Sequence, residues 1–480
     1  MIESKCKESF LQNGTKQICS GIDKKSNTFP WLLYFSGLTA NLLAVNAGFC
    51  MAWLSPVLLK LQSNDTTINP LGVPVTIPQI SIMGSIPPIA GIIGLIVSVK
   101  ISDFLGRKKI LIITAVAFLC SVIITTFANH IYFYYSFLFF RGYAVASYIY
   151  CIPVYINEIS EDGNRGRMGC LMGIAIPLGV LLGFLFGPIT SVRGFTLICG
   201  IPVLLHLILS IFTPESPVFL TLKGRKMECL RTLERLRMIK NVAELEKEYE
   251  KMQMYAANRR TNRNFLDIFR NRATRKAFLI STGVCIVQQF SGIYTFLAFM
   301  GTIFDKTGVA SGNTFGIITG FVQVGMSLIA VLLVDRLGRR SLLLTSSITI
   351  SISLFLLGFY FYLQHIESVL FENLTWVPVF GISLYLIGYG LGLECLPMVL
   401  ASELFPNDLR AKGCGSTLVM NNLAIFFVSF CFPLVSAYLG VEYCMWFFSS
   451  SCFLGFIVMF FVLPETKGKS FIKIQEMLEK

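Results

Sequence analysis

The sequence predicts an all-α polytopic membrane protein, for three reasons: its apolar composition, its long apolar runs and the placement of its cations. Of 480 residues, 54% are hydrophobic and 14% are charged, whereas about 25% are charged in an average soluble protein. One spanning helix takes about 20 apolar residues, so twelve need roughly 240. Because a bilayer core offers no water to backbone groups, each spanning run should be helical.

The apolar runs form six spans, a polar insert and six further spans. The insert, 214–274, is rich in Lys, Arg and Glu, and Leu230, Leu233 and Leu236 follow helical spacing within it. Residues 1–29 and 464–480 are polar tails. The expected spans are 30–61, 78–101, 109–128, 131–157, 167–190 and 195–213, followed by 275–304, 313–334, 341–363, 376–402, 413–437 and 441–463.

The cations fix the predicted orientation. With both tails and the insert in the cytoplasm, 36 of the 40 Lys and Arg residues lie on that side or at its membrane boundary, and the other four are Lys60, Arg141, Arg193 and Lys306. This is the positive-inside bias. It accounts for the net charge of +13, so the sequence predicts no nucleic-acid partner.

The sequence shows no arrangement of residues that is typical of an enzyme active site. The fourteen cysteines are scattered without a CxxC pair, and His130, His206 and His365 lie in separate segments. A metal centre or a His-based catalytic site needs such residues in spaced clusters. We therefore expect no enzymatic activity, cofactor or metal.

Three N-glycosylation sequons test the orientation. Asn64 and Asn373 begin sequons in the two longest predicted outer loops, 62–77 and 364–375. Asn13 begins a third on the predicted inner side, where it should remain unmodified.

Three charged motifs occur in both halves in the same order. DFLGRK at 103–108 corresponds to DRLGRR at 335–340, and PESP at 214–217 corresponds to PETK at 464–467. Between them, a Glu and an Arg seven residues apart follow the fourth span and again the tenth. The offsets are 232, 245 and 250 residues, which indicates an internal repeat.

We interpret these motifs as a cytoplasmic gate, because charges at helix ends pair when two halves close there and separate when they open. The alternative is that they are only topological anchors and helix caps. The predicted gate residues are Asp103, Arg107, Glu158, Arg165, Glu215, Asp335, Arg336, Arg339, Glu403, Arg410 and Glu465.

From about residue 30 to 475, this pattern strongly resembles the sugar transporter family of the major facilitator superfamily. The QQFSGI run at 288–293 and PETKGKS at 464–470 strengthen the likeness. GFCMAWLSP at 48–56 resembles the first helix of insect facilitated trehalose transporters and facilitative glucose transporters. The resemblance implies two pseudo-symmetric six-helix bundles, 30–213 and 275–463, around a sugar site and joined by a cytoplasmic helical linker, 214–274. We expect a monomeric unit in the plasma membrane.

A sugar site needs neutral amides, which both donate and accept, beside aromatic walls. Amides occur deep in the spans at Asn41, Asn46, Gln288, Gln289, Gln323, Asn421 and Asn422. For any single amide, the alternative is hydrogen bonding between helices. One of the adjacent pair Asn421 and Asn422 should point inward more than the other.

The resemblance assigns sugar contact to five positions: Gln288, Gln289, Gln323, Tyr389 and Asn421. Three further positions depart from the family pattern, with Gly173 for a glutamine, Tyr294 for an asparagine and Met398 for a tryptophan. Because of these three differences from the family pattern, both a hexose and trehalose remain possible substrates.

Two features of the spans bear on mechanism. Ser291-Gly292, and the glycines before Pro397, should interrupt the seventh and tenth helices where they line a cavity. No Asp or Glu lies between Asp23 and Asp65, so the first span lacks the acid of proton-coupled relatives. This favours facilitated diffusion. The alternatives are a proton symporter using Glu394, which lies within a span, and a sugar sensor that does not transport.

Overall fold

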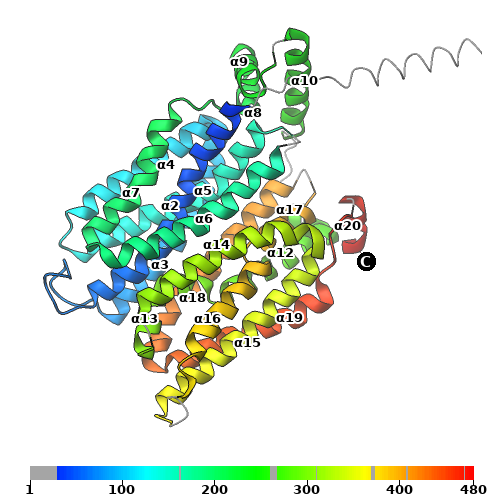
Figure 1. The fold of residues 1–480 in the computed structure, drawn as a ribbon. Coiled ribbons are helices and arrows are strands. Elements are labelled where there is room, and N and C mark those ends of the chain that lie inside the picture. The colour runs from blue at the N-terminus through cyan, green and yellow to red at the C-terminus, as the bar shows by residue number, and fades with distance from the viewer. Residues whose placement is uncertain are drawn as a thin grey trace, which may run out of the picture.

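The computed structural model describes residues 30–161, 164–239, 241–259, 267–309, 311–368, 373–406, 409–469 and 471–479. Within them, twelve helical segments are long and apolar enough to cross a membrane, and no strand occurs. The predicted all-α fold with twelve spans is therefore confirmed. The spans form two groups of six, one early and one late in the chain (Figure 1).

The first six spans are single helices: α2 (Trp31–Leu61), α3 (Ile77–Leu105), α4 (Arg107–Thr126), α5 (Ile131–Ile159), α6 (Arg165–Ile189) and α7 (Val192–Ser210). Their ends follow local signals. Thr76 and Gln79 form a reciprocal cap at the start of α3, and the Ser191 hydroxyl accepts from the Gly194 N–H at the start of α7.

In the second half, two spans are broken. The seventh consists of α12 (Arg272–Phe290) and α13 (Ile293–Phe304), and the tenth of α16 (Val377–Gly388), the π-helical segment η3 (Tyr389–Leu393) and α17 (Leu396–Leu404). The others are α14 (Gly312–Leu337), α15 (Arg339–His365), α18 (Arg410–Tyr438) and α19 (Val441–Val462).

Both breaks lie where the sequence predicts them. Gly292 has φ +83°, a left-handed conformation that glycine adopts without the Cβ clash of other residues. Pro397 lies in the first turn of α17, where its missing N–H costs no helical hydrogen bond.

The insert folds into α8 (Pro217–Leu222), α9 (Lys226–Arg237), α10 (Val242–Arg259) and α11 (Asp267–Arg270). Leu233 and Leu236 are buried, as the helical spacing predicts. Helices α8 to α10, and α20 (Phe471–Glu479), lie at one end of the spans (Figure 1). We call this the insert end. The opposite end, which carries segment 62–76, is the loop end.

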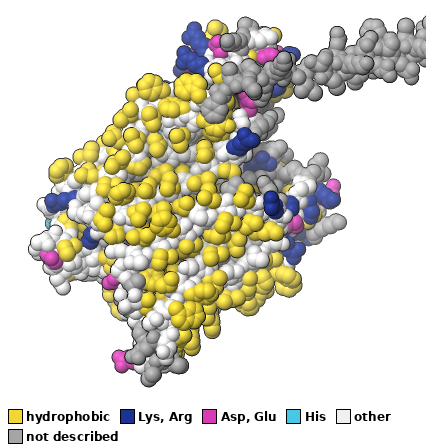
Figure 2. All heavy atoms as spheres, in the orientation of Figure 1, with side chains coloured by type: hydrophobic (Ala, Val, Ile, Leu, Met, Phe, Trp, Pro, Cys, Tyr) yellow, Lys and Arg dark blue, Asp and Glu magenta, His cyan; other side chains and the backbone are white. Residues whose placement is uncertain are grey.

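The outer surface of the spans is apolar. Figure 2 shows hydrophobic side chains covering the spans, with Lys and Arg gathered near the insert end. Leu332 is 68% exposed and Phe461 is 79% exposed. A soluble protein seldom exposes an apolar belt this large, and a bilayer is the solvent that suits it.

Among the described residues, the most extensive contacts between the two halves are those of α2 with α13, α3 with α18 and α6 with α14. In the first pair, the Gly301 N–H donates to the Ser55 hydroxyl at 2.9 Å. In the second, Gly84 lies against Ser429. Both contacts lie between mid-span and the loop end, so the halves are packed together on that side, with a cavity beside these contacts.

Candidate substrate site and charge clusters

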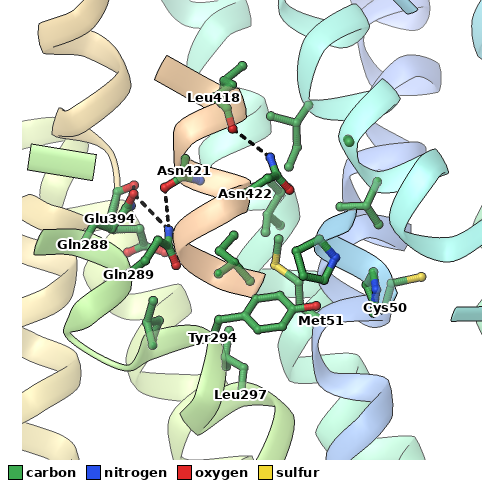
Figure 3. A pocket seen from close by; sticks show the side chains of 18 of the residues that line it. Cys50, Met51, Gln288, Gln289, Tyr294, Leu297, Glu394, Leu418, Asn421 and Asn422 are labelled. Carbon is green, nitrogen blue, oxygen red and sulfur yellow. Dashed lines mark hydrogen bonds between the residues drawn. The ribbon is translucent and has the colours of Figure 1, made fainter. Parts of the chain in front are cut away.

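A cavity of about 280 Å³ lies between the two halves (Figure 3). The first half contributes mostly apolar wall, such as Pro87, Val145 and Ile176, while the second contributes most of the amides. All eight substrate residues predicted from the sequence line it: Gln288, Gln289, Gln323, Tyr389, Asn421, Tyr294, Met398 and Gly173. An apolar cavity with a few convergent polar groups is typical of small-molecule sites.

The amides of the second half form a network. Gln289 Nε2 donates to Asn421 Oδ1 at 2.9 Å and to Gln288 Oε1 at 3.3 Å. Gln288 Nε2 in turn donates to the Leu393 carbonyl at 2.6 Å and to Tyr389 Oη at 3.3 Å. These bonds hold the amides of α12 and α18 in fixed orientations around one side of the cavity and tie them to η3.

The broken tenth helix takes part in this network. Leu393 ends the π-helical segment, and irregular backbone inside a membrane needs polar partners. Gln288 supplies one to the Leu393 carbonyl, and the Ser346 hydroxyl accepts from the Leu393 N–H at 3.2 Å. The helix break and the amide site therefore stabilise each other.

Asn421 and Asn422 both line the cavity but face different partners. Asn421 accepts from Gln289, whereas Asn422 Nδ2 donates to the Leu418 carbonyl of its own helix at 2.9 Å (Figure 3). The Asn422 oxygen lies beside Gly91 of α3. Asn421 thus belongs to the amide network, and Asn422 lies at the boundary between the halves.

The amides of the first span do not reach the cavity lining. Asn41 Nδ2 donates to the Gly37 carbonyl of its own helix at 2.8 Å. Asn46 Nδ2 donates to the Cys199 carbonyl at 2.7 Å and so links α2 to α7. Asn46 therefore follows the alternative of hydrogen bonding between helices, and Asn41 bonds within its own helix.

Two charged side chains also line the cavity. Arg141 Nη2 donates to Tyr294 Oη at 3.3 Å, a contact between the halves. Glu394 Oε1 accepts from Gln323 Nε2 at 3.2 Å. No ion pair joins the two residues within the described part of the chain.

At the insert end, the charged motifs of the first half gather around Arg107, whose side chain is fully buried. Its guanidinium contacts Asp103 at 3.0 Å and Glu158 at 2.9 Å. The Glu158 carboxylate also accepts from the Ser216 hydroxyl. Glu215 accepts the backbone N–H groups of Arg107 and Lys108, each at 3.1 Å, and so caps α4.

The second half repeats this cluster. Arg339 Nε lies 3.2 Å from Glu403 Oε1, and Thr466 Oγ1 donates to Glu403 Oε2 at 2.6 Å. Glu465 accepts the backbone N–H groups of Arg339 and Arg340 at 3.1 Å each. The internal repeat in sequence is therefore also a repeat of contacts.

The equivalent capping carboxylates differ in electrostatics. Burial raises the pKa of Glu215 above its usual value. Desolvation also raises the pKa of Glu465, but backbone N–H groups, including those of Lys467 and Arg339, outweigh it and lower the pKa overall. The difference follows from the deeper burial of the first cluster.

The remaining predicted gate residues make few of the contacts within the two charge clusters. Glu158 bonds to Arg107 and Glu403 bonds to Arg339, and each of these arginines belongs to a G-R motif. Arg410 Nε is buried with no hydrogen-bond partner in the described part of the chain, and Arg336 is exposed. The side chains of Arg165 and Asp335 lie outside the described residues.

Sequence reasoning missed the hydroxyls of Ser216 and Thr466. Each follows the glutamate of its PES or PET motif and donates to the glutamate of another motif. Their matching position after Pro-Glu in both repeats was the available signal.

The predicted glycosylation sites are both exposed near the loop end. Asn64 lies in the segment between α2 and α3, and Asn373 lies between α15 and α16. Asn13 lies outside the described residues.

Several proteins of known identity are similar to this chain. The facilitated trehalose transporter Tret1 of Polypedilum vanderplanki is 29% identical over 458 residues, which cover 95% of this chain and 90% of that protein. Tret1 of Drosophila pseudoobscura pseudoobscura is 28% identical over 452 residues, covering 94% of this chain. The chain spans about half the length of this second relative, 51%.

Solved transporter structures share the fold. The proton:xylose symporter XylE bound to 6-bromo-6-deoxy-D-glucose matches with a TM-score of 0.74 and 22% identity, over 93% of this chain and 99% of that one. The inward-open xylose transporter XylE from E. coli matches with a TM-score of 0.76 and 21% identity, with the same coverage. The sequence profile described as "Sugar (and other) transporter" matches residues 31–478. With a profile match over nearly its whole length and the same twelve-span fold, the chain belongs to the sugar (and other) transporter family.

Proposed function

We propose that the protein moves a sugar across a membrane by facilitated diffusion, as a uniporter that works by alternating access. The amide network between the two halves is the observation that carries this proposal. Gln288, Gln289 and Asn421 present neutral groups that donate and accept, which suits sugar hydroxyls. Members of this family are transporters.

The proposed substrates are a hexose or trehalose. Two of the relatives described above are named as trehalose transporters. Free space in the cavity is a reason to test a disaccharide as well as a hexose. Gly173 lines it, and a Cβ added there would meet no described atom within 4 Å. Met398 and Tyr294 occupy the other two divergent positions.

The orientation that we propose puts the insert end in the cytoplasm and the loop end outside, at the plasma membrane, with a monomer as the functional unit. The cation bias supports this side assignment. The clusters around Arg107 and Arg339 then lie at the inner ends of the two halves, and the contacts described above for each cluster stay within one half. Each ties the ends of several helices together, so each half can move as a unit.

Uptake measurements test the transport proposal. The protein is expressed in cells deficient in sugar carriers, and the entry of glucose, fructose and trehalose is compared with that in cells carrying an empty vector. Saturable entry that stops when the two concentrations are equal supports a uniporter. Binding of a sugar without any entry, in cells or in liposomes, would instead identify a sensor.

A proton symporter is the second candidate, because Glu394 lines the cavity and bonds to Gln323. Uptake at two external pH values separates the two mechanisms. A uniporter shows no accumulation of sugar above its external concentration at either pH. Accumulation driven by external acid, and lost in Glu394→Gln, would reject the uniporter and assign proton transfer to this carboxyl group.

A further inference from the structure

The charged groups of the cavity form an opposed pair. Among the described residues that line it, only Arg141 and Glu394 carry a formal charge. Arg141 comes from α5 in the first half, and Glu394 lies between η3 and α17 in the second half. The lining therefore holds one basic and one acidic side chain, which lie on opposite halves.

Each of the two side chains makes one hydrogen bond to the protein and has one buried polar atom that makes none. Arg141 Nη2 bonds to Tyr294, while its Nη1 is buried with no partner among the described residues. Glu394 Oε1 bonds to Gln323, while its Oε2 is likewise buried and unpartnered in the described part of the chain. A buried charged group with an unmade hydrogen bond is costly, so an occupant that completes both bonds is favoured.

The chemistry of such an occupant is restricted. It must offer an acceptor to Arg141 and a donor to Glu394. A hydroxyl does both, and a molecule with several hydroxyls can meet both groups at once. A ligand with a carboxylate or an ammonium group would pair with one of the two residues and be opposed by the other.

We propose that Arg141 and Glu394 are substrate-contacting residues that hold an uncharged sugar from opposite halves and select against sugar acids and amino sugars. This inference rests on the proposed function and adds residues outside the amide network. It also gives the first half, which contributes mostly apolar wall, a direct polar contact with the substrate.

Binding to purified full-length protein tests the proposal. Calorimetry in detergent compares trehalose and glucose with glucuronate and glucosamine, which carry a negative and a positive charge. Wild-type protein should bind the uncharged sugars best. Arg141→Gln and Glu394→Gln should each weaken that binding about tenfold, as expected for a lost hydrogen bond to a buried charged group.

The two variants should shift selectivity in opposite directions. Arg141→Gln leaves a net negative lining, so glucosamine should gain relative to glucose. Glu394→Gln leaves a net positive lining, so glucuronate should gain. Arg193→Gln and Glu367→Gln, which change exposed charges outside the cavity, should alter none of the affinities.

Folding is checked by thermal unfolding of each variant. If Arg141→Gln does not fold, Arg141→Lys is used, since it keeps the charge and should keep the discrimination against glucosamine. Unchanged affinity for uncharged sugars in both cavity variants, or no opposite shift with the charged sugars, would overturn this inference and leave the proposed function intact. Failure of the wild type to bind any uncharged sugar would overturn both.

Discussion

Replacing Glu158 by alanine should damage the protein more than replacing Glu403, although the internal repeat makes the two residues equivalent. Each carboxylate pairs with the arginine of a G-R motif, but the surroundings differ. The side chains of Arg107 and Glu158 are 0% and 4% exposed. Those of Arg339 and Glu403 are 16% and 26% exposed. Water can therefore compensate a broken pair in the second half better than in the first.

The expected magnitudes follow from burial. Removing one partner of a fully buried pair costs about 3–5 kcal/mol. Arg107 keeps its contact with the exposed Asp103, so the lower end, about 3 kcal/mol, applies to Glu158→Ala. Exposed pairs are worth about 0–1 kcal/mol. The partly exposed Arg339–Glu403 pair lies between these limits, at about 1–2 kcal/mol.

Thermal unfolding of the purified variants and uptake in carrier-deficient cells measure the effect. Glu158→Ala should lower the unfolding temperature and the uptake rate more than Glu403→Ala does. Glu234→Ala, which changes an exposed glutamate on α9, serves as the control and should match the wild type. Equal losses in the two variants, or a larger loss in Glu403→Ala, would show that burial does not determine how much each charge pair contributes to stability and uptake.

Three further predictions concern the site, the helix break and the orientation. Gln289→Leu should weaken sugar binding by about 1–3 kcal/mol, because a buried amide partner is lost; unchanged calorimetric affinity would remove this residue from the site. Gly292→Ala should lower the unfolding temperature, since its left-handed φ and the nearby aromatic ring of α19 leave no room for a Cβ. Gly283→Ala, with open space in α12, should not, and equal behaviour would contradict this account. Glycan mapping after expression in a eukaryotic secretory pathway should find Asn64 modified and Asn13 bare, and a glycan on Asn13 would reverse the proposed orientation.

The membrane architecture could be predicted from the sequence because the bilayer imposes a local rule. A segment must supply enough apolar residues to cross and must satisfy its own backbone. Length and composition therefore suffice to predict the twelve spans and the polar insert. The break at Ser291-Gly292 is local too, because glycine is the residue that adopts a left-handed φ without a steric penalty.

Contacts between distant segments required the tertiary structure. Glu158 bonds to Arg107, which lies 51 residues earlier at the start of α4, and no local spacing in the sequence indicates this contact. Likewise, Asn46 and Asn421 are both amides within apolar spans, but only the second lines the cavity. Sequence by itself determined which segments cross the membrane and which polar residues they carry. Only the packing of the helices decided which of those residues meet, because the rotation of each helix about its axis depends on neighbours far away in the chain.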